Sequence, residues 1–138
     1  MLGDLIRLLD AAYDLRRQID SWARDSYGLP LSQLMTLLTI SQLGGTANVS
    51  QIARAVGRKS HTITVVVDVL EQKGFVNRNR ASAGDRRTVA VSLTRQGREL
   101  ASAEIPDNSA NRLPLSESEQ AHVHEVTDLL ERLVDSAR

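Results

Sequence analysis

Basic residues gathered in the middle of the sequence are its clearest candidates for chemistry. Residues 54–98 contain ten Lys and Arg but three Asp and Glu, a net charge of +7, whereas the whole chain has 17 residues of each sign. The flanking regions therefore carry the compensating −7. Such segregation is typical of a chain whose central region binds a polyanion. A chance fluctuation of surface charge is the alternative interpretation. The charge pattern favours nucleic acid as the partner.

Residues suited to catalysis or metal binding are not grouped in the sequence. The chain has no cysteine, which excludes disulfides, thiolate metal sites and thiol redox sensing. His122 and His124 are two residues apart, so on a helix they point in different directions and cannot chelate one ion without further ligands. Ser, His and Asp residues are scattered, and no phosphate-binding glycine loop is present. We expect no enzymatic activity, no metal and no cofactor.

The N-terminal sequence indicates a cytoplasmic protein. The stretch "MLGDLIRLLDAAYDLRRQID" carries charges throughout and lacks the apolar core of a signal peptide. No apolar run approaches the roughly 20 residues that a membrane-spanning helix needs. We therefore expect no membrane partner.

The segment from Ser60 to Gly74 determines how the basic residues are presented. Seven of the nine residues in 62–70 are β-branched, which by intrinsic preference favours a strand. A leading serine, which would cap the segment, and a closing glycine instead favour a helix. As a helix, the segment has an apolar face formed by Ile63, Val66, Val67 and Leu70. Burying each of these contributes about 1.5–3 kcal/mol, against a few tenths of a kcal/mol lost per β-branched residue, so we predict a helix.

The surrounding sequence predicts a mainly α-helical chain with a small β-hairpin. Apolar periodicity and capping residues predict helices over residues 2–23, 32–43, 51–56 and 60–73, after Thr94 until Pro106, and after Ser116. Ser50 is the expected cap of the third helix, and Ser116 with Glu119 forms a capping box. Segments 75–80 and 88–93 alternate as strands around a polar loop. Segment 46–49 is too short to form more than a β-bridge.

Two adjacent helices followed by a hairpin form a winged helix-turn-helix, and here the chain resembles the MarR family of bacterial winged-helix transcriptional regulators. The likeness is carried by "VSQIARAVGRKSHTITVVVDVLEQKGFVNR" and, after the wing tip, by "DRRTVAVSLTRQG". The resemblance implies an N-terminal dimerisation helix over 1–30, a DNA-binding lobe over 31–98 and C-terminal dimerisation helices over 99–138. Within the lobe it implies a recognition helix at about 60–73 and a wing at about 75–93.

The expected DNA contacts lie in two places. A recognition helix presents its first turn to the major groove, and the polar residues there are Arg58, Lys59, Ser60, His61, Thr62 and Thr64. Near the wing tip are Asp85, Arg86 and Arg87, of which the resemblance implies that the aspartate braces Arg87 for the minor groove. An ion pair that only stabilises the hairpin is the alternative. Phosphate contacts are expected from Arg54, Arg78 and Arg80, which otherwise solvate the helix and strand ends.

The sequence departs from the family at two positions of the recognition helix. Many members have an arginine at the position of Val65 and often another at Val69, and neither valine can neutralise phosphate. The chain would then bind DNA more weakly, rely on its wing, or recognise a T-rich half-site, since Val65 is suited to contact a thymine methyl group. Packing of both valines beneath neighbouring side chains is the alternative.

Apolar stripes at both ends of the chain predict a homodimer, because one small domain cannot bury them alone. The operator of double-stranded DNA would then be a pseudo-palindrome with half-site centres roughly 10 bp apart. The resemblance implies a repressor that a small aromatic or phenolic effector releases from DNA. Candidate effector contacts are Tyr13, Trp22 and Tyr27, with a plain core or interface role as the alternative. A winged-helix protein-interaction module with weak or lost operator binding is the second functional hypothesis.

Overall fold

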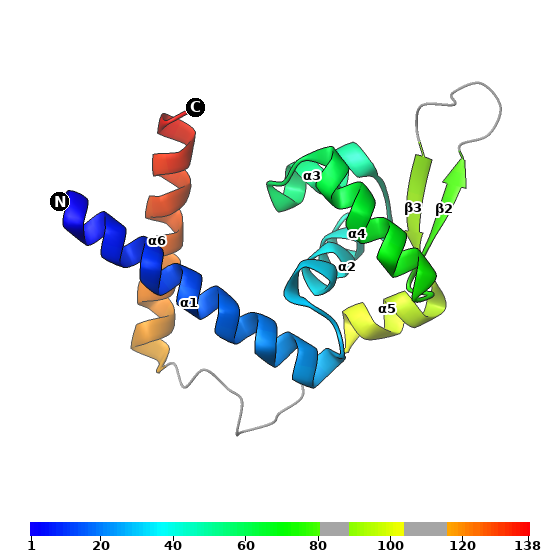
Figure 1. The fold of residues 1–138 in the computed structure, drawn as a ribbon, viewed down its shortest axis with the longest axis horizontal. Helices are drawn as coiled ribbons and strands as arrows, with labels where there is room; N and C mark the ends of the chain where they lie inside the picture. Colours follow the sequence, from blue (N-terminus) through cyan, green and yellow to red (C-terminus); the bar gives the residue numbers. More distant parts are fainter. Residues whose placement is uncertain (81–88, 104–115) are drawn as a thin grey trace. The chain divides into compact units, whose positions relative to one another are not determined.

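The computed structural model describes residues 1–80, 89–103 and 116–138 of the chain, in two compact units, Met1–Pro106 and Asp107–Arg138 (Figure 1). In chain order the elements are α1 (Leu2–Tyr27), α2 (Leu31–Gln42), β1 (Thr46–Asn48), α3 (Val49–Val56), α4 (Ser60–Gln72), β2 (Val76–Arg80), β3 (Val89–Leu93), α5 (Arg95–Ser102) and α6 (Glu117–Ser136). Apart from β1, this order is the predicted one, with a winged helix-turn-helix lobe between terminal helices.

The β-branched segment forms the helix α4, as predicted. Its apolar face is buried, with Ile63 at 1% and Val67 and Leu70 at 0% exposure, and Val66 packs half-buried against the same core. Gly74, with φ of 81°, follows the helix in the left-handed conformation. Burial of this face therefore overrides the strand preference of the individual residues.

Three predicted helix starts were wrong. α3 is capped by Asn48 and not by Ser50, because the Asn48 and Gln51 side chains each accept a hydrogen bond from the other's backbone N–H, at 2.8 and 2.9 Å. α4 has Lys59 as its N-cap residue, and Ser60 is its first helical residue rather than its cap. α2 starts at Leu31, whose N–H donates to Asp20 Oδ1 at 2.8 Å. A carboxylate from α1 thus takes the place of a local cap.

The wing belongs to a three-stranded antiparallel sheet with the order β1-β3-β2. β2 and β3 pair from Val76↔Leu93 to Arg80↔Val89. Segment 46–48 forms β1 and pairs with the other edge of β3, so the prediction of no more than a β-bridge was wrong. The central strand β3 has hydrogen-bonding groups on both sides, and β1 satisfies the second side.

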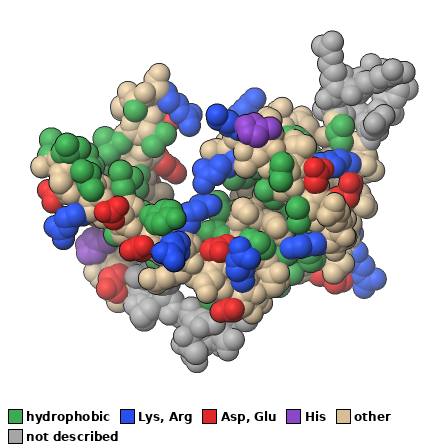
Figure 2. All heavy atoms as spheres, in the orientation of Figure 1, with side chains coloured by type: hydrophobic (Ala, Val, Ile, Leu, Met, Phe, Trp, Pro, Cys, Tyr) green, Lys and Arg blue, Asp and Glu red, His purple; other side chains and the backbone are tan. Residues whose placement is uncertain are grey.

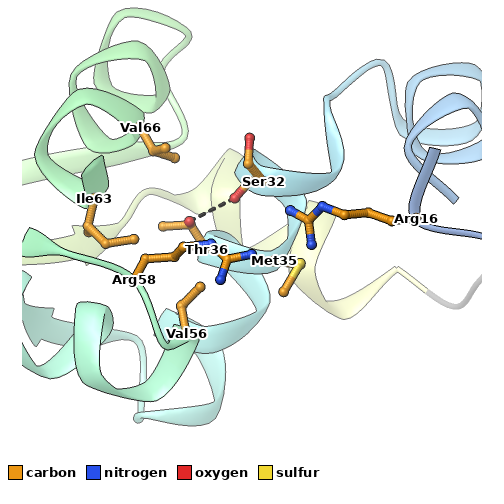
Figure 3. A pocket seen from close by; sticks show the side chains of 8 residues that line it. All are labelled: Arg16, Ser32, Met35, Thr36, Val56, Arg58, Ile63 and Val66. Atoms are coloured by element: carbon orange, nitrogen blue, oxygen red, sulfur yellow. Dashed lines mark hydrogen bonds between the residues drawn. The ribbon is translucent and has the colours of Figure 1, made fainter. Parts of the chain in front are cut away.

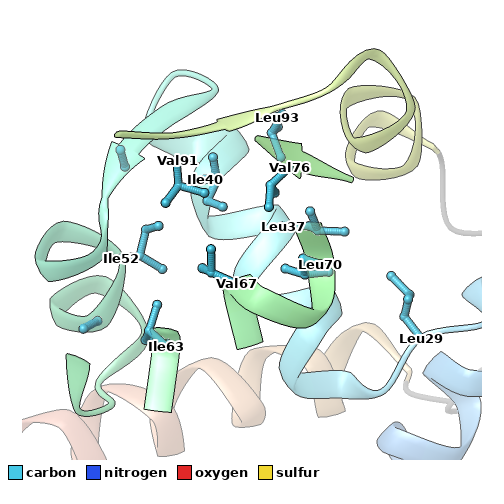
Figure 4. Close-up of a cluster of buried hydrophobic side chains, with 12 residues drawn as sticks. Leu29, Leu37, Ile40, Ile52, Ile63, Val67, Leu70, Val76, Val91 and Leu93 are labelled. Atoms are coloured by element: carbon cyan, nitrogen blue, oxygen red, sulfur yellow. The ribbon is translucent and has the colours of Figure 1, made fainter. Parts of the chain in front are cut away.

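The core of the lobe lies between α2, α3, α4 and the sheet (Figure 4). It contains Leu29, Leu37, Ile40, Ala47, Ile52, Ala53, Ile63, Val67, Leu70, Val76, Val91 and Leu93. α5 is fixed beside it at Thr94, whose side chain caps the helix as predicted and donates to Gly74 O at 2.7 Å. Gly97 has no room for a side chain, because a Cβ there would lie 2.1 Å from Phe75 O. Pro106, the predicted end of this helix, lies outside the described residues.

The terminal helices expose most of their apolar side chains. On α1 the exposed fractions include 66% for Leu9 and 42% for Leu5. Every residue of α6 is exposed or half-buried, although its start carries the predicted capping box of Ser116 and Glu119. Within the described ranges, we find no helix that combines the length and apolarity needed to cross a membrane.

Candidate nucleic-acid interface

The turn between α3 and α4 presents the start of α4 to solvent. Gly57, with φ of 74°, closes α3, and Lys59 is extended before α4 begins. No side chain caps α4, so its first backbone N–H groups are left for an outside acceptor. The free N–H groups and the helix dipole make such a terminus favourable for an anion such as phosphate.

The predicted recognition residues surround this helix start, and all of them are exposed: Arg58, Lys59, Ser60, His61, Thr62 and Thr64. In Figure 2, Lys and Arg side chains lie beside a histidine at the upper middle of the molecule, and others are spread over the rest of this face. Thr64 Oγ1 donates to Ser60 O at 3.0 Å, so this hydroxyl has accepting capacity left but its proton is already used. The remaining side chains have the donors that base edges and phosphates require.

The two valines of α4 differ in exposure. Val65 is 61% exposed and lies one turn after His61 on the outward side of the helix. Val69 is half-buried. Packing beneath neighbouring side chains is therefore ruled out for Val65, and its branched apolar tip faces solvent.

The three arginines predicted to contact phosphate lie in different surroundings. Arg54 is exposed in the last turn of α3. The Arg78 guanidinium instead forms ion pairs with Asp68 and Glu71 of α4. The backbone of Arg80 pairs with Val89, and its side chain lies outside the described residues.

The expected wing contacts Asp85, Arg86 and Arg87 lie outside the described residues, so their roles stay predictions. The two strands that would carry them form the ladder described above. The base of the wing is thus observed, directly beside α4.

A small hollow lies between α1 and the lobe, lined by Arg16, Ser32, Met35, Thr36, Val56, Arg58, Ile63 and Val66 (Figure 3). Its enclosed space is about 30 Å³, about enough for one water molecule, and the rest of the hollow is open to solvent. Two guanidinium groups at an otherwise largely apolar site are suited to an anionic ligand with an apolar body. Sequence reasoning missed Arg16 because it lies on α1, far along the chain from Arg58.

The predicted effector residues are not among those that line this hollow. Trp22 and Tyr27 pack edge to face with ring centroids 5.6 Å apart, and Tyr13 is 65% exposed on α1. Their role in binding an effector stays a prediction. A search of the described residues for three or more clustered His, Cys, Asp or Glu side chains finds no group suited to a metal ion.

Comparisons with known proteins agree with this geometry. The MarR family model matches residues 29–89. The chain is 29% identical over 125 residues to the uncharacterised HTH-type transcriptional regulator YfiV of Bacillus subtilis (strain 168), covering 87% of this chain and 75% of the relative.

Solved structures share the fold over nearly the whole chain. S. aureus MepR, solved as a MepR–DNA complex, superposes with a TM-score of 0.73 at 23% identity and covers 100% of this chain and 99% of MepR. Bordetella bronchiseptica BpsR, whose DNA binding is regulated by 6-hydroxynicotinic acid, superposes with a TM-score of 0.75 at 21% identity and covers 93% of this chain and 98% of BpsR. Residues 29–89 thus carry the match to the MarR family, and the solved structures show that their winged-helix fold extends over nearly the whole chain.

Proposed function

We propose that this regulator is a cytoplasmic homodimeric repressor, released from a pseudo-palindromic operator by a small-molecule effector. The observation that carries the proposal is the uncapped start of α4, with Arg58, Lys59 and His61 exposed around it. This arrangement combines an anion-binding helix terminus with donors for base edges, which major-groove recognition requires. The DNA complex of MepR, a protein of the same fold, supports DNA as the partner.

Val65 adds an apolar contact to this interface. A branched side chain that is 61% exposed on the outward face of α4 is suited to a thymine methyl group in the major groove. The operator half-site should then contain a thymine whose methyl group matters. Replacing that thymine by uracil removes one methyl group and should weaken binding by about fourfold, from about 0.8 kcal/mol per buried carbon.

A uracil scan of the operator tests this contact. One position should show the fourfold loss with the unaltered protein and no further loss with Val65→Ala. If all uracil substitutions act equally on both proteins, Val65 does not contact a thymine methyl group. Thr62→Ala is a control, because it leaves the Val65 side chain in place.

Dimerisation is supported by the apolar side chains that the terminal helices leave exposed. On α6 these include Val123, Val126, Leu129 and Leu133, which are 41–51% exposed. The acidic flanking regions carry the net −7 and are unsuited to DNA, so a second copy of the chain is the partner that fits. Two copies would present two recognition helices to half-sites with centres roughly 10 bp apart.

The effector is proposed to be a small aromatic or phenolic compound, and an acidic one fits best. At the mouth of the hollow between α1 and the lobe, Arg16 and Arg58 suit an anionic group and Met35 and Val66 suit an apolar ring, and the enclosed space of about 30 Å³ would have to widen to admit that ring. Arg58 also lies two residues before the start of α4, so a ligand that holds its guanidinium withdraws it from DNA. The regulation of BpsR by 6-hydroxynicotinic acid, an aromatic acid, supports this chemistry.

DNA binding is tested with the DNA flanking the protein's own gene, by footprinting and by fluorescence anisotropy over a series of salt concentrations. We expect protection of two half-sites and a linear fall of log K with log [salt]. Lys59→Ala should make the slope of log K against log [salt] shallower, by about 0.9 for each phosphate contact that the substitution removes. Arg95→Ala is the charge-matched control, because Arg95 lies on α5 and pairs with Glu99 at 3.0 Å. Binding without salt dependence would contradict the proposal.

The alternative is a protein-interaction module with weak or lost operator binding. It is favoured by α4 itself, which exposes Val65 and carries two carboxylates but no Lys or Arg. Absence of salt-dependent binding to any duplex in the footprinting and anisotropy measurements would select this alternative.

A further inference from the structure

The recognition helix α4 carries acidic side chains close to the surface that is proposed to face DNA. α4 contains Asp68 and Glu71 but no Lys or Arg, and His61 lies in its first turn, so these acidic side chains would face a polyanion without a Lys or Arg partner on the same helix. Their side chains are 50% and 40% exposed. Carboxylates this close to a DNA-facing surface oppose binding unless a cation neutralises them.

Arg78 of β2 supplies that cation and connects the two elements at four points. Its guanidinium forms ion pairs with Asp68 and, at 3.5 Å between Nη1 and Oε1, with Glu71. Its Nη2 donates to the Thr64 carbonyl oxygen at 3.3 Å, and its backbone N–H donates to Glu71 Oε2 at 3.0 Å. We call Thr64, Asp68, Glu71 and Arg78 the Arg78 network.

The network spans two turns of α4, because its three helical members are four and three residues apart. It therefore constrains both the position of β2 along α4 and the direction in which β2 leaves the helix. The Arg78 side chain is 27% exposed, less than either carboxylate. A planar guanidinium with several donors can serve both carboxylates and the carbonyl at once, whereas an ammonium group is a single point of charge.

We propose that Arg78 is a positioning residue for DNA recognition, which holds β2 against α4 and neutralises Asp68 and Glu71, and that it does not contact phosphate. This inference rests on the proposed DNA-binding function. To reach phosphate, the guanidinium would have to leave both carboxylates, and the interface would gain two unpaired negative charges for one contact. The prediction of a phosphate contact for Arg78 is replaced by this role.

The substitution Arg78→Lys separates the two roles. Lysine keeps the positive charge and is a good phosphate partner, but it cannot bridge the two carboxylates and the Thr64 carbonyl together. A positioning role predicts that Arg78→Lys weakens binding to the footprinted operator about tenfold, within the range of couplings between contacting residues. A phosphate contact predicts affinity close to that of the unaltered protein. Circular dichroism verifies that the variant is folded.

Salt dependence and rescue provide the second measurement. In Arg78→Ala the slope of log K against log [salt] should stay unchanged, whereas removal of a phosphate contact lowers it by about 0.9, as expected for Lys59→Ala. Adding Asp68→Asn to Arg78→Ala should restore part of the affinity, because one of the two unpaired carboxylates is then removed.

Any one of three results would overturn the positioning role of Arg78. These are a shallower salt slope in Arg78→Ala, normal affinity in Arg78→Lys, and no rescue of Arg78→Ala by Asp68→Asn. These results are distinct from failure of the proposed function, in which the unaltered protein itself binds no duplex with salt dependence. Arg54→Ala is the matched arginine control, because Arg54 is exposed on α3 and lies outside the Arg78 network. It should lower the slope and should not be rescued by Asp68→Asn.

Discussion

The lobe and the terminal helices differ in how much of their apolar surface this chain buries by itself. In the lobe, Leu37, Ile40 and Val67 are all 0% exposed. On α6, Leu129 and Leu133 are 46% and 48% exposed, although the helix is longer than any in the lobe. The lobe therefore obtains its stability from contacts within the chain, whereas the terminal helices expose apolar side chains that the proposed association would cover.

The largest expected effect separates a lobe leucine from an α6 leucine. Leu70→Ala removes a fully buried side chain and should lower the free energy of unfolding of the lobe by about 2–5 kcal/mol. Leu133→Ala, the matched substitution on α6, should lower it by less than about 1 kcal/mol at concentrations where the chain is monomeric. Urea unfolding followed by circular dichroism measures both, and equal losses would contradict the division between the two regions.

The next effect concerns association. Leu133→Asp places a charge on the exposed apolar face of α6 and should raise the dissociation constant of the dimer at least tenfold, which corresponds to about 1.4 kcal/mol. Analytical ultracentrifugation over a range of concentrations measures this constant. Glu131→Gln is the control on the same helix, since it changes an exposed polar residue. A dimer unaffected by Leu133→Asp would show that this face of α6 lies outside the interface.

A smaller effect comes from two capping boxes of the same kind in the two regions. Asn48 with Gln51 starts α3, and Ser116 with Glu119 starts α6. Asn48→Ala should lower the free energy of unfolding of the lobe by about 1 kcal/mol, because α3 unfolds together with its core. Ser116→Ala should fray the first turn of α6 and leave the unfolding of the lobe unchanged. Amide hydrogen exchange at both helix starts distinguishes these outcomes.

Sequence reasoning was accurate where packing decides the structure. The helix α4 followed from the spacing of Ile63, Val67 and Leu70, because burial of that face exceeds the propensity cost. The resemblance to the MarR family followed from motifs in α4 and after the wing, and the match of residues 29–89 to that family agrees with the expectation of a regulator rather than an enzyme. Both inferences use short-range patterns that a single sequence displays.

Sequence reasoning was less successful for polar contacts, where several nearby residues are chemically suited to the same role. Ser50 and Asn48 both suit a cap, and only the backbone conformation decides that Asn48 takes this role. The ion pairs of Arg78 with Asp68 and Glu71 were missed, because they form only when the turn between α4 and β2 places the strand beside the helix. The available signal was the acidic pair Asp68 and Glu71 on a helix with no Lys or Arg.

The smallest expected effect is a pH dependence that again differs between the regions. The pKa of Asp20 is lowered from its ordinary value of 3.8, first by the hydrogen bond from Leu31 N–H and then by Arg24. The pKa of Glu119 is lowered from 4.5 by hydrogen bonds from the Ser116 backbone and side chain. A lowered pKa stabilises the folded state above the ordinary value, and this stabilisation is lost as the pH falls through the folded value.

Below pH 3.8, protonation of Asp20 should therefore loosen the start of α2 against α1, whereas protonation of Glu119 below pH 4.5 should affect the first turn of α6. Carboxyl titration by NMR should give both midpoints below the ordinary values. Asp20→Asn should remove that part of the acid dependence from the unfolding of the lobe, and Glu119→Gln should leave the lobe unchanged. An equal response of the lobe to both substitutions would mean that α6 and the lobe unfold as one cooperative unit, and the division between self-buried and association-dependent regions would then fail.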